Sequence, residues 1–471
     1  MPSTRLRFLA IVALPFAAAV AQQATSINVP FEKYTLPNGL TVVLSENHAT
    51  PLVAIEVIYH VGSKNEVPGR TGFAHMFEHV MFTGSGHVPY GYHDKYTEGV
   101  GGGNNGETAP DWTRYYETVP SNYVETALWL ESDRMGFLLD SLDETKFRAQ
   151  RDIVKNERRE RTDNAPYARD HEVLGLAMYP RSHPYSWPTI GSMTDLSNAT
   201  VEDVKRFFRL YYAPNNATLV VVGDFDAQQV KRWITKYFGE FARGQTIVRP
   251  TIGPSSLTGE KRLTFEDQVQ VPRLFIQWPS IGVHSEDQPA LDLLSDILGN
   301  TRAARINKTL IYDKQLASSV SVFQNPAEGV GQFEVIVTPR PGHSLTEMET
   351  HVDSMIAQMK RDGPTDDELK RVKAGQQRNL LGGLETNLDK VQQLAQNQIF
   401  FNNPAYSFTT EYARAQAVTA ADVKRVANKY LGKSRIVLSN VPIGKRDMAS
   451  HADKSTVVTD PFTEKSAEVK P

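Results

Sequence analysis

Two stretches of this 471-residue chain share one pattern, and this repeat constrains the possible folds more than any other feature. The tetrapeptide Asp-Val-Lys-Arg at residues 203–206 recurs at residues 422–425, and Tyr211 and Tyr430 have the same separation of 219 positions. Each tetrapeptide lies just after a threonine that can cap a helix, and a strand-forming run follows each tyrosine. We interpret the repeat as an internal duplication, which predicts two α/β halves of about equal size.

The boundary between the halves is expected in a segment rich in proline, glycine and serine, at residues 246–262. This places an N-terminal domain at residues 22–245 and a homologous C-terminal domain at residues 263–445. The remaining residues, 446–471, are polar and lack periodicity. They are predicted to form a disordered tail.

Residues 1–21 have the pattern of a secretory signal peptide. Arg5 and Arg7 precede a 14-residue apolar run from Phe8 to Ala21, which closes with Ala-Val-Ala. The run is too short to span a bilayer comfortably, so we expect cleavage after Ala21 rather than a stable membrane anchor. An uncleaved anchor is the alternative. Cleavage predicts a periplasmic or secreted mature protein.

The composition excludes several classes of function. The chain has no cysteine, which rules out disulfides, thiolate metal ligands and a cysteine nucleophile. Its formal net charge is −3, whereas binding of nucleic acid calls for a basic surface, so we expect no nucleic acid partner. The hydrophobic content of 40% is that of a folded protein with a large core.

A short amphipathic helix is expected between Thr71, which can cap its start, and Gly84, which can end it. Its apolar arc consists of Phe73, Met76, Phe77, Val80 and Met81. His75, Glu78 and His79 lie on the opposite arc. Two imidazoles one turn apart form two corners of a tetrahedral zinc site, and the carboxylate beside them can act as a base. The order His-x-x-Glu-His is the inverzincin motif.

A third metal ligand must come from elsewhere in the chain. The helix predicted after Asp143 has an apolar arc made of Phe147, Ile153 and Val154. Glu157 projects within this arc, and a buried carboxylate needs a partner. That partner is either a metal ion or a neighbouring arginine, Arg158 or Arg159. Glu160 lies at the rim of the arc and is the alternative ligand.

These features together resemble the pitrilysin/insulinase family of zinc metallopeptidases, which includes the mitochondrial processing peptidase. The resemblance rests on His-x-x-Glu-His, on a carboxylate 78 positions after His79 and on the two similar halves, and it covers residues 30–441. It implies an α+β fold of two homologous domains, each an antiparallel-rich sheet with packed helices, which close as a clamshell around a chamber. The pattern Val-Lys-Asn-Glu-Arg-Arg at residues 154–159 is similar to the family's third ligand segment and favours Glu157.

The resemblance also implies the chemistry. One zinc ion per chain would be bound by His75, His79 and Glu157, with water at the fourth position as the nucleophile and Glu78 as the general base. The implied function is that of an endopeptidase or oligopeptidase that hydrolyses short or unfolded peptides in an enclosed chamber.

Residues 104–108, Asn-Asn-Gly-Glu-Thr, resemble the substrate-binding edge strand of the family, with Gly106 where alanine is usual. Asn105, Gly106 and Thr108 are therefore expected to bind substrate. An extended peptide could add to this strand through main-chain hydrogen bonds, with little demand on its side chains.

In many family members the second half adds an arginine and a tyrosine that hold the substrate. Arg305 fits the arginine, but Ser318 stands where the tyrosine is expected, and its hydroxyl cannot reach as far. Tyr312 is another possible donor. The resemblance therefore implies a dimer, and the incomplete pair favours a heterodimer with a related chain that lacks the zinc motif.

Two other classes of function fit the sequence less well. Relatives that serve as non-catalytic assembly subunits generally lose the zinc residues, whereas His75, Glu78 and His79 are intact here. S-ribosylhomocysteine lyase has a related motif and fold, but it is a small single-domain enzyme that uses a cysteine. The present chain has neither trait.

Overall fold

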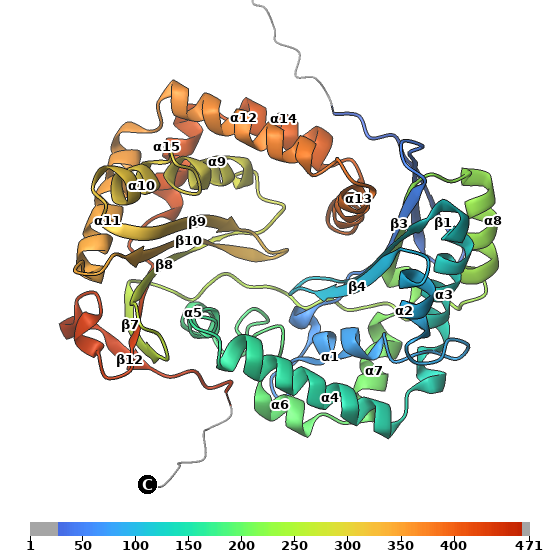
Figure 1. The fold of residues 1–471 in the computed structure, drawn as a ribbon. Coiled ribbons are helices and arrows are strands. Elements are labelled where there is room, and N and C mark those ends of the chain that lie inside the picture. Colours follow the sequence, from blue (N-terminus) through green and yellow to red (C-terminus); the bar gives the residue numbers. More distant parts are fainter. Residues whose placement is uncertain (1–26, 464–471) are drawn as a thin grey trace, which may run out of the picture.

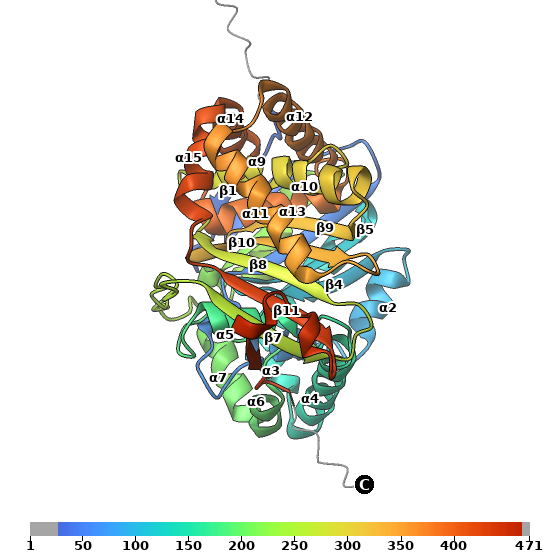
Figure 2. The same cartoon turned by 90° about the vertical axis from the view of Figure 1, so that its left-hand side faces the viewer.

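The chain forms two halves that face each other, each built around a six-stranded sheet (Figure 1). This computed structural model describes residues 27–463, so the predicted signal peptide lies outside the described residues. The strand order is β1-β2-β6-β3-β5-β4 in the first sheet and β12-β7-β11-β8-β10-β9 in the second. Figure 2 shows β10, β8, β11 and β7 of the second sheet side by side.

The first half contains β1 (Glu32–Thr35), β2 (Thr41–Glu46), β3 (Leu52–Tyr59), α1 (Phe73–Val80), α2 (Tyr92–Glu98), β4 (Gly103–Thr108), β5 (Thr113–Pro120), α3 (Val124–Ser141), α4 (Glu144–Arg158), α5 (Asp170–Met178), α6 (Met193–Asn198), α7 (Val201–Tyr211), β6 (Ala217–Gly223) and α8 (Ala227–Phe238).

The second half contains β7 (Lys261–Asp267), β8 (Arg273–Ile281), α9 (Gln288–Leu298), α10 (Arg305–Asn307), β9 (Ala317–Asn325), β10 (Val330–Pro339), α11 (Leu345–Asp362), α12 (Asp366–Gly382), α13 (Asn387–Phe401), α14 (Tyr412–Ala417), α15 (Ala420–Tyr430), β11 (Ile436–Pro442) and β12 (Thr456–Val458). Between α8 and β7, where the linker is predicted, the chain forms no helix or strand.

The duplicated pattern occupies equivalent places in the two halves. Helices α7 and α15 each begin with a capping box, formed by Thr200 with Asp203 and by Thr419 with Asp422. They lead into β6 and β11, which each pair in parallel with one neighbour and antiparallel with the other. The predicted α+β pair of domains with antiparallel-rich sheets is confirmed.

Each half contributes one helix to the sheet of the other half (Figure 1). From the second half, α13 packs Val391, Leu394 and Ala395 on the first sheet, against a face that includes residues of β2, β3 and β6. From the first half, α5 packs Val173 and Leu174 on the second sheet, against residues of β7, β8 and β11. Because helices cover both faces, β6 is buried along its whole length and has a continuous apolar sequence.

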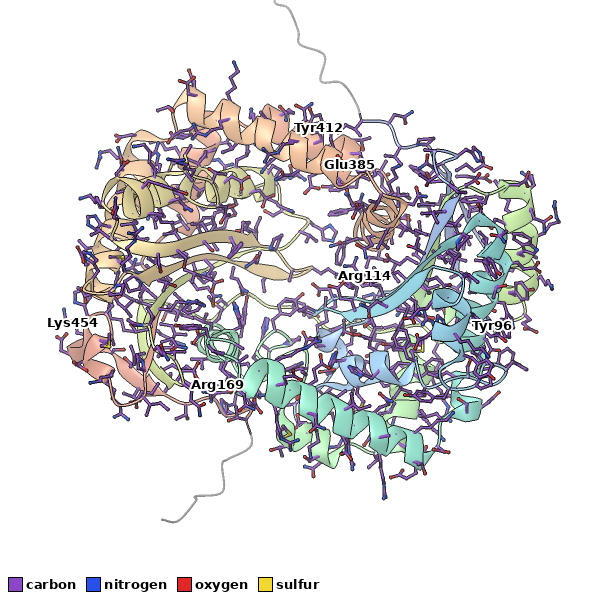
Figure 3. The ribbon with its side chains drawn as sticks, in the orientation of Figure 1. Tyr96, Arg114, Arg169, Glu385, Tyr412 and Lys454 are labelled. Atoms are coloured by element: carbon purple, nitrogen blue, oxygen red, sulfur yellow. The ribbon has the colours of Figure 1, made fainter. Side chains whose placement is uncertain are left out.

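Polar contacts fix the halves beside the exchanged helices. Arg169 precedes α5 and forms an ion pair with Asp267 of the second half (Figure 3). Lys64 is buried and binds Asp111 at 2.9 Å and Glu328 of the second half. These contacts join the two halves into one unit.

The prediction of a disordered tail is wrong for residues 446–463. Strand β12 pairs in parallel with β7, and the backbone N–H of Met193 donates to the carbonyl of Phe462 at 3.0 Å. Nearby, the hydroxyl of Ser450 donates to Glu349. The polar composition concealed a β-branched run, Thr-Val-Val at 456–458, which becomes a strand because it can pair with the edge of β7. Residues 464–471 lie outside the described part.

The helix exchange predicts that the two halves unfold together. Leu394→Ala should lower the free energy of unfolding by about 2–5 kcal/mol, because it leaves a cavity in the core under the first sheet. The thermal transition should remain single, as measured by calorimetry. Leu381→Ala is the control, since Leu381 is 49% exposed and should have little effect. Two separate transitions, with one unaffected by Leu394→Ala, would contradict this prediction.

Candidate metal centre

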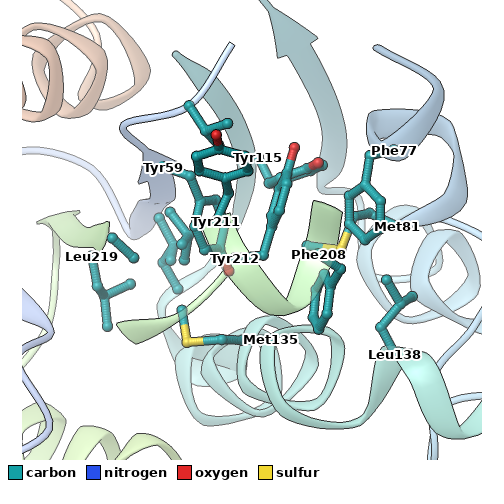
Figure 4. Close-up of a cluster of buried hydrophobic side chains, with 14 of the residues drawn as sticks. Tyr59, Phe77, Met81, Tyr115, Met135, Leu138, Phe208, Tyr211, Tyr212 and Leu219 are labelled. Carbon is teal, nitrogen blue, oxygen red and sulfur yellow. The ribbon is translucent and has the colours of Figure 1, made fainter. Parts of the chain in front are cut away.

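Helix α1 presents His75, Glu78 and His79 on the face that points away from the core. The opposite face packs into the aromatic cluster of Figure 4, where the ring of Phe77 lies 5.0 Å from that of Phe208 and 4.4 Å from that of Tyr212. All five predicted apolar residues are buried: Phe73, Met76, Phe77, Val80 and Met81. This packing fixes the direction in which the polar face points.

The start of α1 differs from the prediction. Its N-cap is Gly72, whose φ of +87° suits glycine, and an added Cβ would lie 2.6 Å from the carbonyl oxygen of Ile190. The carboxylate of Glu66 accepts hydrogen bonds from the N–H groups of Gly72 and Ala74 at 2.9 and 2.8 Å. Glu66 therefore has the capping role predicted for Thr71, whose hydroxyl donates to Asp195 instead. The helix also ends before the predicted Gly84, at Val80.

Glu157, from the last turn of α4, meets both histidines. Its Oε2 lies 3.1 Å from Nε2 of His79 and 3.7 Å from Nε2 of His75. The three donor atoms lie within 4.8 Å of one another. Glu160, the alternative ligand, lines the same cavity but does not belong to this donor group.

The other oxygen of Glu157 faces an arginine that the sequence analysis did not name. Arg161 Nη1 lies 2.8 Å from Glu157 Oε1, at the i+4 spacing typical of helical ion pairs. Its side chain is 75% exposed, so the pair contributes little to stability. Arg158, one of the predicted partners, is buried and binds Glu172 instead.

The protonation states of these groups suit a metal ion. Burial lowers the pKa of His75 to about 4, so its imidazole is neutral near pH 7. A hydrogen bond from His79 and the nearby imidazole of His75 lower the pKa of Glu157, which keeps it ionised. A neutral imidazole and an ionised carboxylate are the forms that bind zinc, and two nitrogens with one oxygen form a donor set of catalytic zinc sites. The residues present therefore fit zinc.

Glu78 lies beside these donors and is held by the edge strand. The hydroxyl of Thr108 donates to Glu78 Oε2 at 2.5 Å. Burial raises the pKa of Glu78, and the Thr108 hydrogen bond opposes this shift because it stabilises the ionised form. Glu78 is thus placed as a proton acceptor that is not itself one of the three donors.

The predicted substrate strand lies at the same place. Strand β4 is the last strand of the first sheet and pairs with β5 on one side. Asn105, Gly106 and Thr108 line a cavity of about 630 Å³ together with the three donors. A Cβ added at Gly106 would lie 2.9 Å from Cγ of Glu78, so the glycine lets the strand approach the base closely.

The environment of Ile153 differs from the prediction. The sequence places Ile153 in the buried arc of α4, but the residue is 45% exposed and lines the cavity. The helical period correctly places Ile153 on the same face of α4 as Phe147 and Val154. It does not show that this face is buried at Phe147 and Val154 but lines a cavity at Ile153 and Glu157. Asn156 lines the cavity as well and was not predicted.

The structure does not bring Arg305 to this centre. Its guanidinium binds Glu368 through two hydrogen bonds of 2.8 and 2.7 Å and also donates to the carbonyl of Gly363. The hydroxyl of Ser318 donates to the carbonyl of Thr338 at 3.1 Å. Among the described residues, those that line the cavity all belong to the first half.

Comparison with known proteins gives two family matches. Residues 41–182 match the model described as insulinase (peptidase family M16), and residues 198–376 match the model described as peptidase M16 inactive domain. The zinc protease PqqE of Helicobacter pylori is 30% identical over 403 residues, which cover 85% of this chain and 90% of that protein. An uncharacterized zinc protease of Bacillus subtilis, YmxG, is 26% identical over 371 residues, covering 78% and 88%.

The fold is similar to solved structures as well. A crystal structure of a protease from Helicobacter pylori superposes with a TM-score of 0.81 at 30% identity, covering 88% of this chain and 99% of that one. The match extends over both halves, which accords with the arrangement of two sheets described above.

The contact between Thr108 and Glu78 predicts a pH effect. Thr108→Val should raise the pKa of Glu78 further, because it removes a hydrogen bond that stabilises the ionised carboxylate. The acidic limb of a profile of kcat/KM against pH should then move to higher pH. Thr108→Ser keeps the hydroxyl and should leave the limb near its original position. A limb that moves equally in both variants would show that the hydroxyl is not the cause.

Proposed function

The chain belongs to the insulinase family, peptidase family M16, and from this premise we propose that it is a zinc-dependent endopeptidase that acts on short or unfolded peptides. The observation that carries the proposal is the convergence of His75, His79 and Glu157 beside the free edge of β4, with Glu78 next to them. Three protein ligands leave a coordination position open, as a catalytic zinc site requires.

The residues divide the work as follows. His75, His79 and Glu157 would hold one zinc ion, which when bound supplies a Lewis acid for the scissile carbonyl and lowers the pKa of water toward about 7. Glu78 would take the proton of the attacking water on its carboxylate and pass it to the leaving amine nitrogen. Thr108 would hold Glu78 in place for both transfers.

The substrate would be held through its backbone. A peptide laid along β4 as an added strand receives main-chain hydrogen bonds from the free edge, within reach of the three donors. This mode of binding places little demand on side chains, which supports broad cleavage rather than a single recognition motif. It requires an extended peptide, which supports short or unfolded substrates.

Export is a separate part of the proposal. It rests on the sequence pattern of residues 1–21 and would leave a mature chain that begins at Gln22, in the periplasm or outside the cell. Within residues 27–463, no helix combines the length and apolar character needed to cross a bilayer.

The roles of base and ligand predict different results on substitution. Glu78→Gln should keep zinc, because no ligand is lost, and should lower peptide hydrolysis by about 100- to 10,000-fold. His75→Ala should lose the metal and the activity together. Metal analysis and hydrolysis of a quenched fluorescent peptide measure both quantities. Glu160→Gln is the control, since Glu160 lines the cavity outside the donor group and should retain zinc.

Two results would contradict these roles. If Glu78→Gln lost zinc as completely as His75→Ala, the assignment of base and ligand would be wrong. If the zinc-loaded wild-type chain and Glu78→Gln hydrolysed peptides equally, Glu78 would not be the base.

A second candidate is that this chain is the zinc-carrying subunit of a heterodimer with a related chain that lacks the zinc motif. The observation that favours it is the pairing of Arg305 with Glu368, which leaves that guanidinium away from the cavity, while Ser318 is bound to a backbone carbonyl. In this arrangement neither Arg305 nor Ser318 lines the cavity as a donor for the oxyanion. Tyr312, the other possible donor, lies beside the guanidinium of Arg302 at 4.8 Å.

The second candidate predicts that the zinc-loaded chain is weakly active alone. A partner isolated with it from the native host should raise peptide hydrolysis by about 100- to 1000-fold, the usual cost of a missing oxyanion donor. Mass measurement in solution and peptide hydrolysis, with and without the partner, test it. Full activity of a single chain or a homodimer, unchanged by any added chain, would leave the first candidate alone.

A further inference from the structure

A second group of possible metal ligands lies inside the first half, apart from the candidate peptidase centre. His93 on α2, Glu117 on β5 and Glu131 on α3 place one ligand atom each within 4.8 Å of the others. All three side chains are buried, with exposed fractions of 7%, 0% and 1%. Three separate elements therefore converge on one enclosed point with a nitrogen and two carboxylates.

Most polar atoms of this group are unpartnered. Both ring nitrogens of His93 and both carboxylate oxygens of Glu117 are buried, and none has a hydrogen-bond partner within residues 27–463. Leaving buried polar groups unpaired costs about 1–3 kcal/mol each and more for charged groups, so native proteins rarely do so. The imidazole of His93 and the carboxylate of Glu117 therefore need a bound ion or molecule between them that bonds to both.

The charges of the buried side chains also favour a bound cation. Glu131 is bound by Arg134, whose Nε lies 2.9 Å from Glu131 Oε2, and Arg134 is itself buried over the rings of Phe82 and Tyr115. One guanidinium therefore faces two carboxylates, Glu117 and Glu131. A buried negative charge without a counter-charge is costly, so a proton or a cation must balance it.

A cation satisfies this group better than a proton. A proton on Glu117 would remove the charge, but His93 and Glu117 form no hydrogen bond with each other, so the proton would not join them in this arrangement. Burial lowers the pKa of His93 well below its usual value, so the ring is neutral and has a free lone pair for a metal. One divalent ion would use that lone pair and would change the net charge of Arg134 and the two carboxylates from −1 to +1. Glu131 can serve as a ligand while it accepts from Arg134, because a carboxylate has about four acceptor positions.

We propose that His93, Glu117 and Glu131 form a second, structural site for a divalent transition-metal ion such as Zn²⁺. Imidazole with carboxylate oxygens is a donor set that suits zinc. Phe82 contacts both sites: its ring lies 6.1 Å from that of His93, and a Cβ added at Gly106, which lines the candidate peptidase centre, would lie 3.0 Å from its Cε2. The proposal does not depend on peptidase activity.

The ion would stabilise the substrate strand. Helix α2 is connected to β4 through Asn104, whose amide donates to Thr97 at 2.6 Å and to Asp94 at 3.1 Å. An ion bound by His93 would join α2 to β5 and α3, and β4 pairs with β5. Both neighbours of the edge strand would then be connected through one metal site.

The test counts bound zinc after the first centre has been removed. The double variant His75→Ala/Glu157→Ala is loaded with Zn²⁺, freed of excess by gel filtration and analysed for metal. We expect it to retain one zinc ion per chain and the wild-type chain to retain two, because the groups share no ligand. Adding the nearly isosteric Glu117→Gln to the double variant should abolish the remaining zinc. Glu98→Gln, an exposed change on α2, is the control and should retain it.

Two further measurements keep the test decisive if Glu117→Gln does not fold. His93→Phe removes the nitrogen ligand and preserves an aromatic ring beside Phe82, so it should also abolish the remaining zinc. Co²⁺ bound to the double variant should give visible absorption bands of a low-symmetry site without any change in this cluster. A double variant that retains no zinc and gives no cobalt bands would overturn the proposal. Zinc retention unchanged by both Glu117→Gln and His93→Phe would overturn it equally.

Discussion

The exchange of helices between the halves is the constraint on which the rest of the structure depends. Helix α13 covers the face of β3 and β6 in the first sheet, and α5 covers the corresponding face of the second sheet. Without α13, the apolar residues on that face of β2, β3 and β6 would be exposed to water. Strand β3 pairs with β5, and β5 pairs with β4, so the position of the edge strand depends on a helix from the other half. The first half carries all three donor residues but does not have a complete core of its own.

The geometry of the candidate centre is set by the two faces of the short helix α1, one packed on the core and the other lining the cavity. The aromatic packing of Phe77 fixes α1 on the core, while Glu66 caps its start from outside the helix. This leaves His75 and His79 at the rim, where both line a cavity and burial lowers the pKa of His75. Glu157 reaches them because α4 packs on α1. The donor set is therefore produced by tertiary packing as much as by the spacing of the histidines.

The sequence predicts those parts of the fold and of the candidate site that depend on a local periodicity or spacing. The two arcs of α1 follow from 3.6 residues per turn, and the duplication follows from an exact match of spacing. Sequence and structure differ where a partner distant in the sequence decides. Arg305 is a predicted substrate-binding residue, and the structure pairs its guanidinium with Glu368, 63 positions later, away from the cavity. The strand at 456–458 exists because β7 offers an edge, and Ile153 is exposed because its face of α4 continues into a cavity. The cluster around Glu117 is brought together by three elements, and no single period indicates it.

The free edge of β4 has a further consequence for what the proposed enzyme can degrade. An added strand must supply N–H groups at alternate positions, and proline has none to supply. The backbone of a peptide would then determine whether it resists cleavage. A proline at a position that must donate an N–H group, or a tight turn, would protect the peptide whatever its other side chains. Such a filter selects by conformational freedom. Folded proteins would escape it while their damaged or newly exported, still unfolded copies would not.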